Sequence, residues 1–253
     1  MRKVTYTLPC GNSYFVRFAE LLDEPVVLIA GATGSGKSVV LEHLLRTLLL
    51  TKFPICGIPK GAQLWIADPK KVELLEFKNL PHTRNGGRYE NTLHGILRML
   101  ADLEGVMDAR FLDMERRRLR KWDGSHIYLL IDELADLMIS AKKETTAHLI
   151  KLTQLCRAAG IHIIACTQCP NRTVITAPIQ CNITASIALR CSTAIESRQI
   201  VGIAGAEALP KHGRVMIKNG CEVNYMTIPM IDRDELAEVV EHWMRQTKGW
   251  WKK

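Results

Sequence analysis

The residues with the clearest chemical potential lie at positions 31–38, where the chain reads GATGSGKS. A glycine, four residues and then Gly-Lys-Ser is the spacing of a loop that binds phosphate groups. Its glycines allow main-chain conformations closed to other residues, so several N–H groups can approach one anion. Lys37 is expected to reach the β- and γ-phosphates of ATP, and Ser38 to ligate Mg²⁺. The residues expected to surround the nucleotide are Gly31, Thr33, Gly34, Ser35, Gly36, Lys37, Ser38 and Val39.

A pair of acids provides the second half of a hydrolytic site. The apolar run at 127–131, IYLLI, ends in Asp132 and Glu133. Carboxylates after a buried parallel strand lie at the sheet edge where α/β proteins bind ligands. We therefore predict that Asp132 completes the Mg²⁺ shell. Glu133 would orient and deprotonate the attacking water, as general-base catalysis requires.

Two more polar residues follow from neighbouring segments. Gln168 comes directly after the apolar run 161–166 and Thr167, so its amide would sit at a third strand tip, where it could sense the γ-phosphate or position water. A plain loop glutamine is the alternative. Arg157 ends a helical pattern and has two interpretations. It caps that helix, or it reaches the nucleotide of a neighbouring subunit as a catalytic arginine.

These residues require a particular scaffold. Residues 26–30 read as a buried strand, and the apolar spacing over 39–50 predicts a helix directly after the phosphate loop. We predict an α/β fold, a mostly parallel sheet with helices on both faces, in which the ends of strands 26–30 and 127–131 are neighbours. Residues 91–121 are expected to form one long helix, and residues 4–18 a β-hairpin.

Composition narrows the function classes. The chain has 253 residues, 47% of them hydrophobic, and a formal net charge of +8, which favours a polyanionic partner such as nucleic acid. The sequence contains no run of about 18 apolar residues, so no membrane span is expected. The eight cysteines are expected to be free thiols of a cytoplasmic protein. We expect one domain over 1–253, with an extension at 1–24, a core at 25–230 and a closing helix and tail at 231–253.

Six segments in a fixed order resemble one family. They are residues 31–38, 67–77 with 80–82, 131–138, 157–168, 174–176 and 196–209. From about Pro25 to the end, the chain resembles the motor domain of FtsK/SpoIIIE-type DNA translocases. The resemblance implies a RecA-like P-loop NTPase core, a homo-hexameric ring around double-stranded DNA, and ATP hydrolysis at subunit interfaces. It makes Arg157 the first choice for the arginine acting across subunits, and Arg110 the second. Asp68 and Lys70 match an Asp-Pro-Lys segment without an assigned role.

The chain also departs from the family pattern. Cys169 stands where Arg precedes proline in the family, Gln180 stands at a lysine, and residues 184–186, TAS, replace Pro-Thr-Arg. Three positive charges are therefore missing from one region. No appended winged helix is expected from the 253 residues, so the chain resembles a stripped motor of the kind that mobile elements, plasmids and phages carry.

Three other functions fit the same residues. A conjugative coupling ATPase would deliver a relaxase–DNA complex to a secretion channel, and its membrane anchor would come from another protein. A type VII-like protein-secretion ATPase would bind peptides in place of DNA. A monomeric nucleotide switch would leave Arg157 without a neighbouring nucleotide to reach.

Overall fold

The computed structural model describes residues 13–51, 62–71, 73–84 and 86–246. Eight strands form one sheet in the order β3-β2-β4-β5-β1-β6-β7-β8. Six of them, from β3 to β6, run parallel, and β7 and β8 extend the sheet as antiparallel strands. The strands are β1 (Val26–Ala30), β2 (Gln63–Ala67), β3 (Arg88–Glu90), β4 (Ile127–Ile131), β5 (Ile161–Thr167), β6 (Ala185–Ala188), β7 (Arg214–Asn219) and β8 (Glu222–Thr227). The predicted mostly parallel α/β fold is confirmed.

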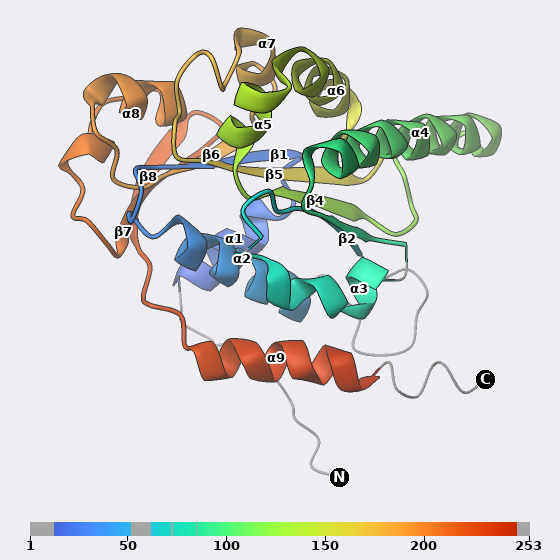
Figure 1. Cartoon of the computed structure of the whole chain (residues 1–253), viewed down its shortest axis with the longest axis horizontal. Coiled ribbons are helices and arrows are strands. Elements are labelled where there is room, and N and C mark those ends of the chain that lie inside the picture. The colour runs from blue at the N-terminus through green and yellow to red at the C-terminus, as the bar shows by residue number, and fades with distance from the viewer. Residues whose placement is uncertain (1–12, 52–61, 72, 85, 247–253) are drawn as a thin grey trace.

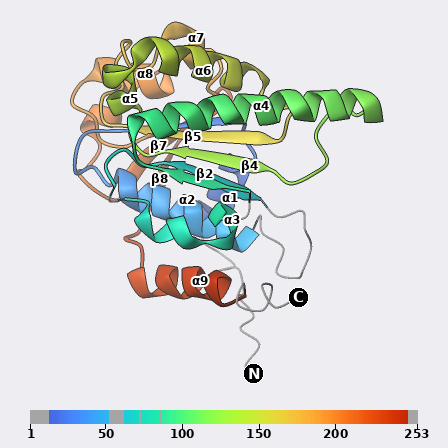
Figure 2. The same cartoon turned by 45° about the vertical axis from the view of Figure 1, so that its right-hand side comes forward.

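Helices cover both faces of this sheet, as Figure 1 shows. One face carries α4 (Leu93–Arg117), α5 (Leu134–Ser140), α6 (Lys142–Leu155), α7 (Ala177–Gln180) and α8 (Ala194–Val201). The other carries α1 (Ser13–Leu21), α2 (Lys37–Thr51) and α3 (Pro81–Arg84), with α9 (Arg233–Gln246) outside them (Figure 2). Two 3-10 turns, Leu75–Asn79 and Ala206–Ala208, complete the described elements. None of the described helices is both long and apolar enough to cross a lipid bilayer.

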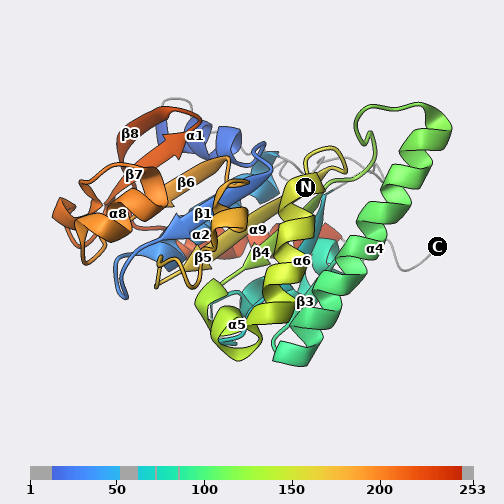
Figure 3. The ribbon, with the colours of Figure 1, turned by 90° about the horizontal axis from the view of Figure 1, so that it is seen from above.

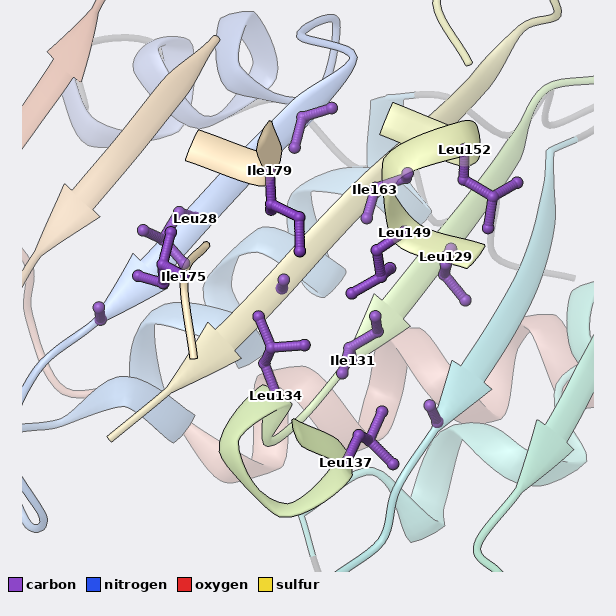
Figure 4. Close-up of a cluster of buried hydrophobic side chains, with 14 of the residues drawn as sticks. Leu28, Leu129, Ile131, Leu134, Leu137, Leu149, Leu152, Ile163, Ile175 and Ile179 are labelled. Atoms are coloured by element: carbon purple, nitrogen blue, oxygen red, sulfur yellow. The ribbon is translucent and has the colours of Figure 1, made fainter. Parts of the chain in front are cut away.

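Two hydrophobic layers hold the central strands in place. Because β1, β4 and β5 are buried along their whole lengths, their side chains alternate between the two layers. Figure 4 shows the first layer, where Leu129 and Ile163 of the sheet face Leu149 and Leu152 of α6. Seen from above, α4, α5 and α6 lie over this part of the sheet (Figure 3). The strand ends are thereby fixed at one edge.

The order of the strands differs from the sequence-based expectation in one respect. Strands β1 and β4 are not neighbours, because β5 lies between them and pairs with both. Ala30 pairs with Thr167, and Ile131 pairs with Ala165. The residues after Ile131 therefore reach the level of the end of β5, which places a third strand tip between the other two.

The N-terminal expectation is wrong where the structure describes it. Residues 13–18 of the expected hairpin belong to α1, while residues 4–12 lie outside the described part of the chain. Phe15, Phe18 and Leu21 are buried at helical spacing, so the packing of one helix face favours a helix over a hairpin here.

The closing helix, expected with the tail at 231–253, is α9 (Arg233–Gln246). It docks on α2 through two ion pairs: Arg233 Nη2 lies 2.7 Å from Glu42 Oε1, and Arg46 Nη2 lies 2.6 Å from Glu235 Oε2. Leu236 and Val239 are buried beneath it. The C-terminal segment thereby covers the helix that follows the glycine-rich loop.

Candidate active site

The glycine-rich loop connects the end of β1 to the first residue of α2, Lys37. Gly34 and Gly36 have φ angles of 72° and 99°, the left-handed region that favours glycine. At Gly31 a side chain is excluded for another reason, because a Cβ there would lie 2.8 Å from Leu189 Cβ. The loop therefore adopts a conformation that its glycines make possible, and its N–H groups precede a helix N-terminus, which favours anions.

A pocket of about 700 Å³ opens beside this loop. Of the residues expected to surround a nucleotide, all but Gly31 line it. Val40, directly after the loop, and Gln168 also line it. Sequence analysis missed the rest of the lining, which comes from segments distant along the chain: Glu73, Leu189, His212, Gly213, Val215, Ile228, Pro229 and Met230. No local pattern marks these residues. All of them except Glu73, which follows β2, reach the pocket because β6, β7 and β8 extend the sheet beside β1.

Gln168 joins the loop to the acidic strand end. Thr33 Oγ1 donates a hydrogen bond to Gln168 Oε1 at 2.6 Å, and the Gln168 main-chain N–H donates to Glu133 Oε1 at 3.1 Å. The strand tips of β1, β5 and β4 are therefore linked by direct contacts. Lys37, Gln168 and Glu133 lie at one edge of the sheet, as the sequence-based hypothesis requires.

Lys37 is half-buried at this edge. Burial lowers the pKa of its ammonium group, and the charge of Glu133 is the largest of the effects that oppose this shift. The two side chains therefore share one electrostatic environment. An anion in the pocket would stabilise the charged form of Lys37 further.

Asp132 has the features of a cation ligand. Its side chain is buried, and Oδ2 has no hydrogen-bond partner among the described residues. Desolvation raises its pKa to about 6, although the charge of Lys70 opposes the shift. An unpartnered, buried carboxylate oxygen next to a phosphate loop fits Mg²⁺, which prefers oxygen ligands. Ser38, the other expected ligand, lines the pocket.

The raised pKa predicts a pH-dependent cost to stability. The folded chain holds the Asp132 proton up to about pH 6, whereas the ordinary value is 3.8. The bound proton therefore adds to the free energy of unfolding below pH 3.8, and this contribution is lost as the pH rises from 3.8 to about 6. Asp132→Asn cannot ionise, so without Mg²⁺ and nucleotide it should exceed the wild type in free energy of unfolding by roughly 1–3 kcal/mol at pH 7.5. Urea unfolding at pH 7.5 and pH 4 would measure this. A variant less stable than wild type at pH 7.5 contradicts the prediction.

Glu133 is held by three donors. It caps the N-terminus of α5, where its Oε1 accepts a hydrogen bond from the Ala135 N–H at 3.3 Å in addition to that from Gln168. Its Oε2 lies 3.0 Å from Lys70 Nζ. The carboxylate is 3% exposed and is not among the residues that line the pocket.

The Asp-Pro-Lys segment follows β2, and its aspartate and lysine make contacts with different parts of the molecule. Asp68 is fully buried, where Oδ2 accepts a hydrogen bond from the Tyr89 hydroxyl at 2.8 Å and Oδ1 accepts one from the Lys71 N–H at 2.9 Å. Asp68 therefore fixes the loop after β2 to the neighbouring strand β3. Lys70, in contrast, reaches the site itself through Glu133.

The two candidate arginines lie in different environments. Arg157 is exposed in the turn before β5, so it lies at the sheet edge opposite Gln168, and no ion pair of its side chain is found within the described ranges. Arg110 is buried and donates to the carbonyl oxygens of Ala159 at 2.6 Å and Ser125 at 2.8 Å, with its guanidinium 4.7 Å from the Trp122 ring. The contacts of Arg110 inside its own subunit therefore disfavour the second choice, that Arg110 reaches a neighbour's nucleotide, and Arg157 stays the first choice.

The parallel sheet, the phosphate loop at the end of β1 and the acids at the end of β4 together define a RecA-like P-loop protein. The model of the FtsK/SpoIIIE family matches residues 11–127 and 121–172. The chain belongs to the FtsK/SpoIIIE family.

Sequence relatives agree with this placement, and solved structures share the fold. The chain is 30% identical to DNA translocase FtsK of Oceanobacillus iheyensis, over 98% of this chain and 33% of the relative. It is 31% identical to DNA translocase SpoIIIE of Bacillus subtilis, over 91% of this chain and 31% of the relative. The chain thus spans about a third of the length of these relatives. The pCW3 conjugation coupling protein TcpA, solved with ATPγS, has a TM-score of 0.73 at 24% identity and covers 87% of this chain and 65% of its own. EssC of Geobacillus thermodenitrificans has a TM-score of 0.72 at 19% identity, and the match covers 90% of this chain and 44% of EssC. These two likenesses show the fold alone.

Proposed function

We propose that this chain is a single motor domain that hydrolyses ATP and couples hydrolysis to the movement of double-stranded DNA. The observation that carries the proposal is the line of contacts from Thr33 through Gln168 to Glu133 beside the pocket and Lys37. A pocket of about 700 Å³ lies in the range that suits a nucleotide-sized ligand.

The chemistry assigned to these residues is an in-line phosphoryl transfer to water. Lys37 and the loop N–H groups bind the phosphates and stabilise their negative charge. Glu133 accepts a proton as the water oxygen bonds to the γ-phosphorus, and the bond to the bridging oxygen breaks, so that its electron pair leaves with ADP. Gln168 orients the water or senses the γ-phosphate. Mg²⁺, held by Ser38 and Asp132, would neutralise phosphate charge.

DNA is the substrate that the charge and the relatives favour. The formal net charge of +8 suits a polyanion, and the sequence relatives are named DNA translocases. We propose a homo-hexameric ring in the cytoplasm in which Arg157 completes the site of the next subunit. We also propose that the protein is encoded by a mobile element, plasmid or phage. Its partner there would be a relaxase or a secretion channel.

The test is the rate of ATP hydrolysis with no DNA, with a single strand and with a duplex. We expect the duplex to raise the rate and added salt to reduce the effect, because phosphate contacts release counterions. The protein carrying Glu133→Gln, purified in parallel, controls for contaminating ATPases. A rate that DNA leaves unchanged but a secretion-signal peptide raises would favour the protein-secretion alternative.

A further inference from the structure

Glu133 is poorly placed to act on water in the arrangement that the structure records. All three of its described partners are donors: the Gln168 and Ala135 N–H groups on Oε1, and the Lys70 ammonium on Oε2. A base needs a lone pair within hydrogen-bond reach of the proton that it accepts. Here the two N–H groups use both lone pairs of Oε1, and the Lys70 ammonium uses one of the two on Oε2. This carboxylate is also almost fully buried and does not line the pocket. The loss of one partner would therefore free a further lone pair for the proton that a base accepts.

Lys70 is the partner that can leave at the lowest cost. The two N–H donors belong to the main chain of α5 and of the segment after β5, so they cannot move without moving those elements. The Lys70 side chain is 33% exposed, and lysine carries its ammonium on a flexible four-carbon stem. Burial lowers its pKa, but the hydrogen bond and charge of Glu133 outweigh this effect and leave the pKa above its ordinary value, so the group is a full cation.

The backbone on either side of Lys70 is fixed. Asp68 is hydrogen-bonded to Tyr89 and to the Lys71 N–H, and Lys71 adopts a left-handed conformation with a φ of 63°. The Lys70 ammonium therefore pivots on a rigid turn. Lys70 contributes to the electrostatic environment of Lys37, so it lies close enough to respond to phosphates bound there.

We propose that Lys70 is a positioning residue that restrains Glu133 in the resting state and keeps ATP hydrolysis slow until it is drawn off the carboxylate. The inference rests on the proposed ATPase function and deepens it. In the resting protein, the ion pair occupies one position on Oε2 and places the Lys70 ammonium beside the carboxylate oxygen that would accept the proton of water. When Lys70 turns away, Oε2 becomes available to water, and the two main-chain N–H groups keep Oε1 in place.

The test is the DNA-free kcat for ATP of Lys70→Met. We expect it to rise about three- to tenfold, the range for an ion pair between a buried and a partly exposed group. The KM for ATP should change little, and the DNA-stimulated rate should stay the same, so the stimulation ratio falls. Lys70→Gln also removes the charge and should give the same rise, whereas Lys70→Arg keeps the charge and should keep the low rate. Lys71→Met, the same charge change at the next residue, is the matched control.

A second variant shows whether Lys70 acts through Glu133. Lys70→Met combined with Glu133→Gln should be no faster than Glu133→Gln alone. An unchanged or lower DNA-free kcat in Lys70→Met, or an equal rise in Lys71→Met, would overturn the inference while leaving the proposed function intact. A wild-type protein that hydrolyses no ATP would overturn the proposed function and this inference with it.

Discussion

Glu133→Gln is expected to reduce the kcat for ATP hydrolysis by about 10²–10⁴-fold, the usual contribution of a positioned general base. Glutamine has nearly the same shape, and its amide oxygen can still accept the hydrogen bonds from the Gln168 and Ala135 N–H groups. It cannot accept a proton from water at neutral pH. The loss should therefore fall on the chemical step and leave the site folded.

Two measurements separate chemistry from binding. The variant should bind a fluorescent ATP analogue about as well as wild type, since Lys37 and the loop are unchanged, while steady-state kcat falls. Glu144→Gln makes the same charge change at an exposed position in the first turn of α6 and should leave kcat unaltered. A Glu133→Gln protein with the wild-type kcat would show that another group activates water.

The parts of this site that sequence alone predicts are those that depend on local pattern. The loop at 31–38 and the acids after 127–131 are recognisable because a strand, a turn and a helix each have their own periodicity. Parallel strands then bring their carboxyl ends to one edge without further information. This is also why Gln168, at the end of a third apolar run, was found.

The missed features depend on contacts between distant segments. His212 and Met230 reach the pocket through the antiparallel extension of the sheet, which no local signal announces. The ion pair of Lys70 with Glu133 joins residues 63 positions apart. Whether an arginine faces inward is equally non-local. Arg110 is buried only because the turn that carries Trp122 and Ser125 folds back over it.

Arg157→Ala is the second change with a large expected effect. An arginine supplied from a neighbouring subunit contributes about 10³–10⁵-fold to kcat in phosphoryl transfer. Arg157 precedes β5, and the seven residues of that strand span about 20 Å to Gln168, since each residue advances about 3.3 Å. That distance exceeds the reach of an arginine side chain, so Arg157 cannot serve the pocket of its own subunit. We expect kcat to fall by that order, while ATP binding to the isolated subunit is retained. Arg245→Ala, an exposed arginine on α9, is the control and should leave kcat near wild type.

Mixing two inactive variants tests the direction of this contribution. An Arg157→Ala subunit keeps its own Glu133, and a Glu133→Gln subunit keeps its own Arg157. In a mixed ring, some pockets with an intact Glu133 face an intact Arg157, so ATP hydrolysis should partly return. If the arginine acted within its own subunit, every mixed site would lack one of the two groups and no activity would return. The recovered rate therefore distinguishes an arginine that works between subunits from one that works within its own subunit, whereas an arginine that only caps the helix before β5 would leave Arg157→Ala active at the start. The rate should also depend on protein concentration, because assembly brings the two residues together.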